Sequence, residues 1–519
     1  MPPVSHVLCG LAANSALPAE LVDRLITVAD ADTAAELAVR EDLTVAQVRA
    51  LVTRVPEIAV RLVHEGRLTE ADIDPVAQPD AALALLGEGG GPPRWARLLA
   101  KDPDRARRER LAACPRLPAD VAEALVADVD VPVVAEVASH AAREVTARLA
   151  AHPHAEVRRA VAANGSTPPA LLAALLTGAG LPAARRCLVC DREEVPFVHD
   201  RECPRPDCEL PPGASCDGSH ESTVLAVQEA ALRNPATPAE AAAGFVDHPS
   251  ALVRWTLAAR TDLPPRVSER LAADPVPGVR EEVAANPAVD GALLRVLAGD
   301  PSHGVRRAVA HHPHVPLDVL VRVAGNTRIG PTLLPRIAAA SPAEVEELAR
   351  ASGPAARMFL AQRRDLPARI RDALATDADA KVVKSVATDP GLSEGQLRAM
   401  VDRHGSRVVA KVAANPGASA ALLEEITRHG QAARKALREV ARHPRATATA
   451  LRACLVDEEG RRRAAGHPAL PPPVLLELLD DADWQVVEAA AGNPSLPRAV
   501  MGDLINRLSP EAGSPLTHS

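Results

Sequence analysis

Residues 187–220 contain a dense cluster of cysteines and histidines, which is the composition of a metal site. Four cysteines follow the spacing C-x₂-C-x₁₂-C-x₄-C, and a fifth cysteine and two histidines lie close by. Two thiolates three positions apart can reach one metal ion, and the prolines of CPRPDC favour turns between the second pair. The candidate ligands are Cys187, Cys190, Cys203 and Cys208, with Cys216, His199 and His220 as alternatives.

Two metal centres fit this set of donors. Four thiolates, or three thiolates and one imidazole, form a tetrahedral zinc site. Four thiolates also hold an iron–sulfur cluster. The alternative is that the cysteines are unpaired in an irregular insertion, but free thiols of cytosolic proteins seldom lie so close together in sequence. We therefore expect one metal centre in this segment.

The composition of the 519-residue chain excludes several classes of protein. The net charge of −8 argues against a dominantly phosphate-binding protein. Eight cysteines are too few for a disulfide framework, and the first residues lack the pattern of a signal peptide, so we expect a cytoplasmic protein. No apolar run is long enough to span a membrane, so no membrane partner is expected.

Outside the cysteine cluster, the chain repeats one unit at a spacing of mostly 26 residues. The unit reads D/H-P-x-x-x-V-R-x-x-V-A-x-N-P-x-x-P-x-x-L-L-x-x-L, and we use its asparagine as the marker of each repeat. A fixed period of this length is typical of stacked repeat architectures. The marker position falls at Asn14, Arg40, Cys114, His140, Asn164, Asn234, Arg260, Asn286, His312, Arg364, Asp389, Asn415, His443, His467 and Asn493.

Each unit predicts two short helices. Valines such as Val279 and Val283 share one face of a first helix, and a proline such as Pro275 suits its first turn. The proline after many markers ends this helix, and a proline four positions after the marker opens a second helix. Leucines such as Leu294 and Leu297 share a face of that second helix. Neither helix can bury its apolar face alone, so the units must stack.

The motif V-R-x-x-V-A-x-N-P-x-x-P-x-x-L-L-x-x-L resembles the leucine-rich repeat variant family over residues 95–179 and 224–507, and more weakly before residue 95. The resemblance implies repeats that pair an α-helix with a 3₁₀ helix and stack into a right-handed superhelix. We therefore expect an all-α fold, a right-handed α-solenoid of two-helix repeats with an internal cysteine-rich insertion. Some members of that family carry a cysteine-ligated [4Fe–4S] cluster at the N-terminus. Because the cysteines here are internal, zinc is favoured over [4Fe–4S].

The cysteine cluster begins where a repeat is expected. Residues 184–191 align with residues 157–164, which predicts that Cys187 and Cys190 lie at the end of a repeat helix. The segment that follows has little apolar content and could not order itself by burial. Binding one metal would supply the energy that compacts it and would keep the stack continuous.

Arginines recur six positions before the marker, so a solenoid would align them in a ladder. Such a ladder could bind nucleic acid or an acidic protein, through Arg158, Arg254, Arg280 and Arg306. The favoured interpretation is instead a solvated helix face whose arginines pair with nearby acids.

The chain carries no recognisable catalytic motif, so we expect a non-catalytic scaffold that binds a protein partner. Nucleic-acid binding and an iron–sulfur redox or sensor role are the alternatives. The expected segments are degenerate repeats (1–94), repeats (95–186), the metal-binding insertion (187–222), further repeats (223–507) and a disordered tail (508–519).

Overall fold

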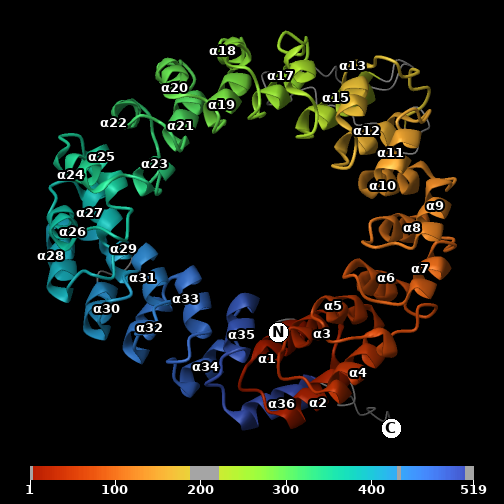
Figure 1. Ribbon diagram of the computed structural model, residues 1–519. Helices are drawn as coiled ribbons and strands as arrows, with labels where there is room; N and C mark the ends of the chain where they lie inside the picture. The colour runs from red at the N-terminus through yellow and green to blue at the C-terminus, as the bar shows by residue number, and fades with distance from the viewer. Residues whose placement is uncertain (1–3, 188–220, 429–433, 509–519) are drawn as a thin grey trace, which may run out of the picture. The chain divides into compact units, whose positions relative to one another are not determined.

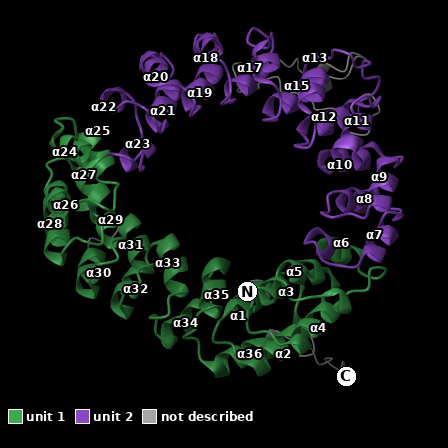
Figure 2. Ribbon diagram, in the orientation of Figure 1, with its two compact units in different colours: residues 1–84, 341–519 green, residues 85–340 purple. Residues whose placement is uncertain are grey.

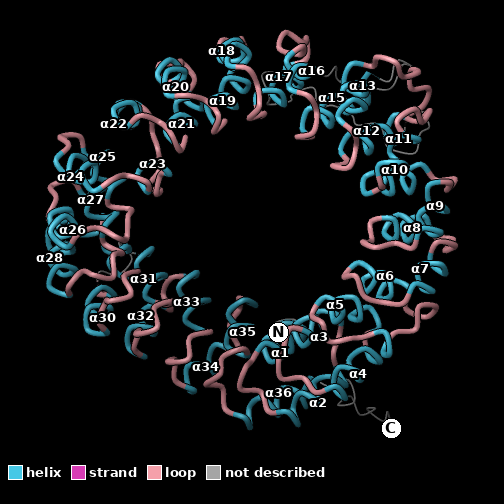
Figure 3. Tube along the Cα trace, in the orientation of Figure 1, coloured by secondary structure: helices cyan, strands magenta, loops and turns pink. Residues whose placement is uncertain are grey.

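The computed structural model describes residues 4–187, 221–428 and 434–508, and in these ranges the regular secondary structure is helical (Figures 1 and 3). The described residues contain no strand beyond one isolated bridge between His154 and Arg186. The predicted all-α solenoid of helix-pair repeats is confirmed. The 3₁₀ component differs from the expectation, because most described repeats pair two α-helices. The 3₁₀ segments of the described residues are η1 (Pro56–Ile58), η2 (Glu70–Asp72) and η3 (Gly405–Arg407).

The chain divides into two compact units (Figure 2). Unit 1 contains residues 1–84 and 341–519, and unit 2 contains residues 85–340. The boundary lies within α6 (Pro79–Gly87) on one side and just before α24 (Pro342–Arg350) on the other. The segment boundaries expected from the sequence follow composition and not this division, and they stay predictions.

In unit 2, the first helices of successive repeats pack on one another in a continuous row, and the second helices lie behind them (Figure 1). We call the row of first helices the inner row. The inner row contains α8 (Arg105–Ala112), α10 (Val131–His140), α12 (Ala155–Ala163), α15 (Glu221–Arg233), α17 (Ala251–Ala258), α19 (Pro277–Ala285) and α21 (His303–His311). The second helices are α9 (Ala119–Val126), α11 (Arg143–Leu149), α13 (Pro169–Thr177), α16 (Ala239–Ala243), α18 (Pro265–Ala272), α20 (Gly291–Leu297) and α22 (Leu317–Asn326), with α7 (Pro93–Leu99) before them and α23 (Pro335–Ala338) after them.

Unit 1 has the same two layers. Its first helices are α25 (Pro354–Leu360), α27 (Ala380–Val386), α29 (Val409–Ala413), α31 (Arg434–Val440), α33 (Glu458–Ala465), α35 (Trp484–Ala491), α1 (Val4–Ala13) and α3 (Ala31–Ala38). Its second helices are α26 (Ala368–Ala375), α28 (Glu394–His404), α30 (Ala420–Thr427), α32 (Ala448–Cys454), α34 (Pro472–Leu478), α36 (Arg498–Leu508), α2 (Ala19–Val28) and α4 (Val45–Arg54), and α5 (Ala59–His64) follows η1.

The prolines define the helix starts, with one correction to the expectation. Pro168 and Pro264, four positions after their markers, are the N-cap residues of α13 and α18, as predicted. The proline eleven positions before the marker does not lie in the first turn. Pro275 precedes α19 by two residues, because the helix begins at Pro277. The apolar faces are as predicted, since Val279, Val283 and Leu294 are buried.

The marker residue joins each repeat to the one before it. The Asn286 Nδ2 donates hydrogen bonds to the carbonyl oxygens of Ala258 (2.8 Å) and Arg260 (2.7 Å), and its Oδ1 accepts from the Ala288 N–H. Asn164, Asn234, Asn415 and Asn493 make the same pair of donations to the preceding repeat. These bonds satisfy backbone carbonyls that would otherwise be buried without a donor.

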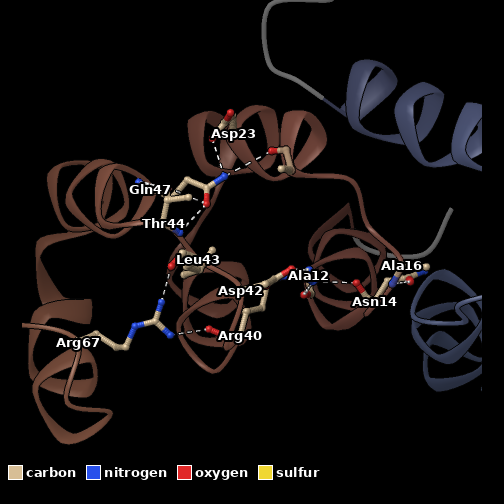
Figure 4. A network of polar contacts seen from close by, with 11 residues as sticks. Ala12, Asn14, Ala16, Asp23, Arg40, Asp42, Leu43, Thr44, Gln47 and Arg67 are labelled. Carbon is tan, nitrogen blue, oxygen red and sulfur yellow. Dashed lines mark hydrogen bonds and ion pairs between the residues drawn. The ribbon is translucent and has the colours of Figure 1, made fainter.

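Arginine replaces asparagine at some markers (Figure 4). The Arg40 Nη1 donates to the carbonyl oxygens of Ala12 (2.9 Å) and Asn14 (2.7 Å), while its Nε bonds Asp42. The marker arginine is therefore recognised by its ion pair with an aspartate two positions later. Arg363 forms this pair with Asp365, so the marker of that repeat is Arg363 and not the predicted Arg364.

Within unit 1, the first repeat of the chain packs on the last. The Asn14 Nδ2 donates to the carbonyl oxygens of Ala491 (2.9 Å) and Asn493 (2.8 Å), which is the marker pattern of consecutive repeats. The His6 ring stacks on Trp484 at 4.1 Å, and α1 lies directly against α35. The stack of unit 1 therefore continues from the C-terminal repeat into the N-terminal one.

Candidate interaction groove and the predicted site residues

Cys187 is the one predicted metal ligand that falls in the described part of the chain. Its side chain is fully buried, but it does not lie on a helix, so this part of the sequence prediction was wrong. Residues 182–187 run beside the start of α12, where the Ala155 N–H donates to the Arg186 carbonyl at 2.9 Å. Pro182 and the left-handed Gly178 and Gly180 turn the chain away from helical geometry before it reaches this cysteine.

Residues 184–187, the described part of the repeat expected at 184–191, do not form its helix. The Asn234 Nδ2 donates to the carbonyl oxygens of Ala162 (3.0 Å) and Asn164 (2.9 Å), so the repeat of α15 docks directly on the repeat of α12. A repeat between them would have offered its own carbonyls to Asn234. The stack therefore passes directly from α12 to α15, and the role of a metal in the insertion stays a prediction.

The other predicted ligands lie outside the described residues; they are Cys190, Cys203, Cys208, Cys216, His199 and His220. In the part of the chain that the structure describes, no group of three or more His, Cys, Asp or Glu side chains could hold a metal. The metal centre stays a prediction. Burial raises the thiol pKa of Cys454 to about 12 and that of Cys114 to about 11, so both thiols stay protonated at neutral pH.

The predicted arginine ladder is used inside the protein. The Arg280 Nε and Nη2 bond both carboxylate oxygens of Asp300 at 2.7 and 3.0 Å, and its Nη1 donates to the Asp274 carbonyl at 2.7 Å. Arg254 repeats this geometry with Asp274. The side chains of Arg280 and Asp300 are only 12% and 7% exposed.

Two ladder arginines use other acceptors. The Arg306 Nε donates to the Thr327 hydroxyl at 2.9 Å, and its Nη1 donates to the Asp300 carbonyl at 2.6 Å. Arg158 donates to the carbonyl oxygens of His152 (2.6 Å) and Pro182 (2.5 Å). The four predicted binding arginines are thus anchored to neighbouring repeats or to adjacent chain.

The Arg–Asp pairs change the acidity of their members. Burial would raise the pKa of Asp300, but the hydrogen bonds from Arg280 and the Ser302 backbone outweigh it and hold the pKa below its usual value. The hydrogen bond to Asp300 raises the pKa of Arg280. The sequence analysis favoured pairing with nearby acids, but on a solvated face and without identifying them. The aspartate that opens the repeat template is the acid that binds the arginine of the preceding repeat.

The inner row of unit 2 forms an open groove across α8, α10, α12 and α15, with a volume of about 620 Å³. Alanines from α10, α12 and α15 line the groove together with charged side chains. The floor residues are Ala135, Ala160, Ala163, Ala226 and Ala230. An open groove of this volume, with both alanines and charged side chains in its lining, can hold a short segment of polypeptide chain.

Charged side chains of both signs line the edges of the groove. Arg159 pairs with Glu156 at 2.9 Å, and Arg233 pairs with Glu229 at 3.0 Å. More than half of each arginine side chain stays exposed, so the guanidinium groups can still meet a partner. The pairs are local to one helix, and exposed pairs of this kind contribute little to stability.

The inner row continues past the groove to a tryptophan. Arg159, Glu229, Trp255 and Glu281 each lie five positions before a marker, and their helices are consecutive neighbours in the inner row. Trp255 is 36% exposed, and Leu252, three positions earlier on α17, is 45% exposed. In a chain with three tryptophans, three phenylalanines and no tyrosine, an aromatic side chain at an exposed inner position stands out. Sequence reasoning missed this position because it is not part of the repeat template.

Among the residues that the structure describes, no helix combines the length and the apolar composition needed to cross a membrane.

No protein-family profile matches this chain. No curated protein matches it either. Among solved structures, the chain is similar to a leucine-rich repeat variant with a novel repetitive structural motif, at 21% identity and a TM-score of 0.27, over 53% of this chain and 87% of the other. It is also similar to Kap121p in its complex with Nup53p, at 11% identity and a TM-score of 0.23, over 96% of this chain and 51% of the other.

A further similar structure is that of the Pds5–Scc1 complex, at 13% identity and a TM-score of 0.14, over 94% of this chain and 64% of the other. Similarities at these TM-scores do not bear on function, which therefore depends on the geometry of the site.

Proposed function

We propose that the protein is a non-catalytic scaffold and that it binds an extended segment of a partner protein in the groove of unit 2. The groove across α8, α10, α12 and α15 is the observation that supports this function. Its alanine floor accepts a polypeptide backbone closely, and its charged edges offer ion pairs to side chains of either sign.

The arginine ladder does not favour nucleic acid as the partner. Arg254 and Arg280 each bond an aspartate of the next repeat through two nitrogen atoms, so their charge is compensated within the stack. The net charge of −8 adds a general repulsion of phosphate. A protein segment is the ligand that this distribution of charge favours.

Peptide selection tests the proposal. Peptides from a random displayed library are selected on the full-length protein, synthesised, and titrated by fluorescence anisotropy in about 0.15 M salt. Ala163→Phe fills the groove and is expected to weaken binding at least about tenfold. Ala170→Phe is the matched control, because Ala170 is an exposed alanine of the same repeat but lies on α13.

Two results would contradict the groove as the site. One is equal binding by the protein with and without Ala163→Phe. The other is an equal loss in the Ala170→Phe control, which would indicate a general effect on folding. Tight binding of random-sequence duplex DNA in the same salt, with none of the peptides, would favour the nucleic-acid alternative.

A further inference from the structure

Trp255 lies beside two glutamates that have different environments. The Trp255 side chain lies within reach of the Glu282 carboxylate, while its ring stays partly exposed. Glu282 and Glu281 are adjacent on α19, which packs on α17. The Glu281 carboxylate lies against Gly304 in the first turn of α21, where the positive end of the helix dipole holds it.

This arrangement leaves negative charge next to an aromatic face. Among the described residues, neither glutamate forms an ion pair with a basic side chain, in contrast to Glu156 and Glu229 at the edges of the groove. Burial raises the pKa of Glu282, and the neighbouring charge of Glu281 raises it further. A cation bound nearby would oppose both effects, because it stabilises the charged form of each carboxylate.

The same patch offers apolar surface to the stem of a long side chain. Leu252 is exposed one helical turn before Trp255, and both residues face away from the buried side of α17. Lysine and arginine cover apolar surface with their methylene groups while their charged ends meet an acid or an aromatic face.

We propose that the partner segment places a lysine or arginine side chain on Trp255, with Glu281 and Glu282 as its counter-charges. The inference depends on the proposed function, because it names the chemistry of the same partner where it leaves the groove. Trp255 lies on the repeat that follows α15, so a chain that runs along the groove reaches it next. Tryptophan and arginine dominate the energy of many protein interfaces, which makes this contact an anchor for the segment.

Binding of a short oligolysine peptide to the full-length protein tests the inference directly. We expect binding in about 0.15 M salt, with Trp255→Ala weakening it at least about tenfold and Trp255→Phe weakening it less, since a phenyl ring retains part of the cation–π attraction. Glu281→Gln and Glu282→Gln should each weaken it several-fold. An oligoglutamate peptide of the same length should not bind.

The control for the glutamates is a pair with the same spacing. Glu458 and Glu459 are adjacent on α33, but they pair with Arg462 and Arg463, so the double change Glu458→Gln and Glu459→Gln should leave oligolysine binding unchanged. Circular dichroism of Trp255→Phe verifies that the protein folds.

The outcomes distinguish this inference from the proposed function. If Trp255→Ala and Glu282→Gln leave the affinity for oligolysine unchanged, the peptide is attracted by the overall negative charge of the protein and the inference is wrong. If selected peptides still lose affinity with Ala163→Phe but not with Trp255→Ala, the groove stands and the anchor at Trp255 does not.

Discussion

At the scale of single residues, neutral histidine can replace asparagine at the marker position because both side chains offer a donor to the preceding repeat and an acceptor to the following turn, although the imidazole makes one donation where asparagine makes two. The His312 Nε2 donates to the Asn286 carbonyl at 2.9 Å, and its Nδ1 accepts from the His314 N–H at 3.0 Å. A protonated ring would lose the acceptor and direct a proton at that N–H. Burial also disfavours the charged imidazolium, and this lowers the pKa of His312.

A pH-dependent stability follows from the neutral ring. Because the pKa of folded His312 lies below the unfolded value of 6.5, the unfolded chain binds the proton more readily as the pH falls below 6.5. We expect His312→Asn to keep the hydrogen bonds and to reduce the loss of unfolding free energy on acidification. His312→Ala should cost about 1–3 kcal/mol at neutral pH, because it leaves buried backbone groups unsatisfied. Urea unfolding of the three proteins between neutral and mildly acidic pH measures both effects, and an unchanged pH profile in His312→Asn would contradict the assignment.

The predicted metal ligands give a second test at this scale. Cys190→Ser and Cys203→Ser, which change residues outside the described ranges, should each abolish the metal content of the purified protein. Elemental analysis for zinc and iron decides between the two predicted centres, and Cys9→Ala is the control because Cys9 lies in the first repeat. An unchanged metal stoichiometry in both serine variants would refute this choice of ligands.

At the scale of helices, buried Arg–Asp pairs couple several of the first helices to the next repeat. Arg280 on α19 reaches Asp300, which lies before α21, and the pair is almost fully buried. Removing one member of a buried pair leaves an uncompensated charge and costs about 3–5 kcal/mol. Arg280→Met and Asp300→Leu should therefore each destabilise the protein strongly, while the double variant recovers part of the loss.

Hydrogen exchange of amides in α19 and α21 measures this coupling as a double-mutant cycle. Because the folded pKa of Asp300 lies below its ordinary value of 3.8, the contribution of the pair is present above pH 3.8 and is lost as the pH falls towards the folded value. Strictly additive effects of the two substitutions would contradict a direct pair.

The helix pattern was predictable from the sequence because it depends on local chemistry. Proline and the marker fix where helices start and end, and valines such as Val279 fix the buried face. The marker near residue 363 was misplaced because two consecutive arginines both fit the template, and only the ion pair with Asp365 identifies Arg363. The groove and Trp255 were not predictable, since exposed inner positions vary freely between repeats and acquire meaning only when the repeats align.

At the scale of the whole molecule, the stack passes directly from α12 to α15, although the sequence between them contains a further match to the template. Residues 184–191 match the template in composition, yet Asn234 bonds the repeat of Asn164 directly. A stacked repeat is therefore identified by whether its carbonyls receive the next marker, and sequence similarity to the template alone does not establish this. The same criterion applies where the two ends of the chain meet in unit 1.

The contact between the first and last repeats requires a glycine. A Cβ at Gly10 would overlap the Glu488 carbonyl oxygen and approach the Ala491 Cβ to 2.8 Å, so α1 and α35 can pack this closely only with glycine there. Gly10→Leu should force the helices apart, at a cost of about 1–3 kcal/mol, and should expose the apolar side of α35. Gly395→Leu is the control, because a side chain at that helical glycine of the same unit meets nothing within 4 Å.

Terminal repeats of a solenoid expose an apolar face unless something covers it, and here each end covers the other. In Gly10→Leu we expect amides of α1 and α35 to exchange faster by a similar factor, since separation of the two helices exposes both at once. Amides of α27 and α29, further along the same unit, should change little. Faster exchange in α1 alone would mean that the N-terminal repeat frays without protecting α35, and the mutual capping inferred from Asn14 and its two carbonyl acceptors would then be wrong.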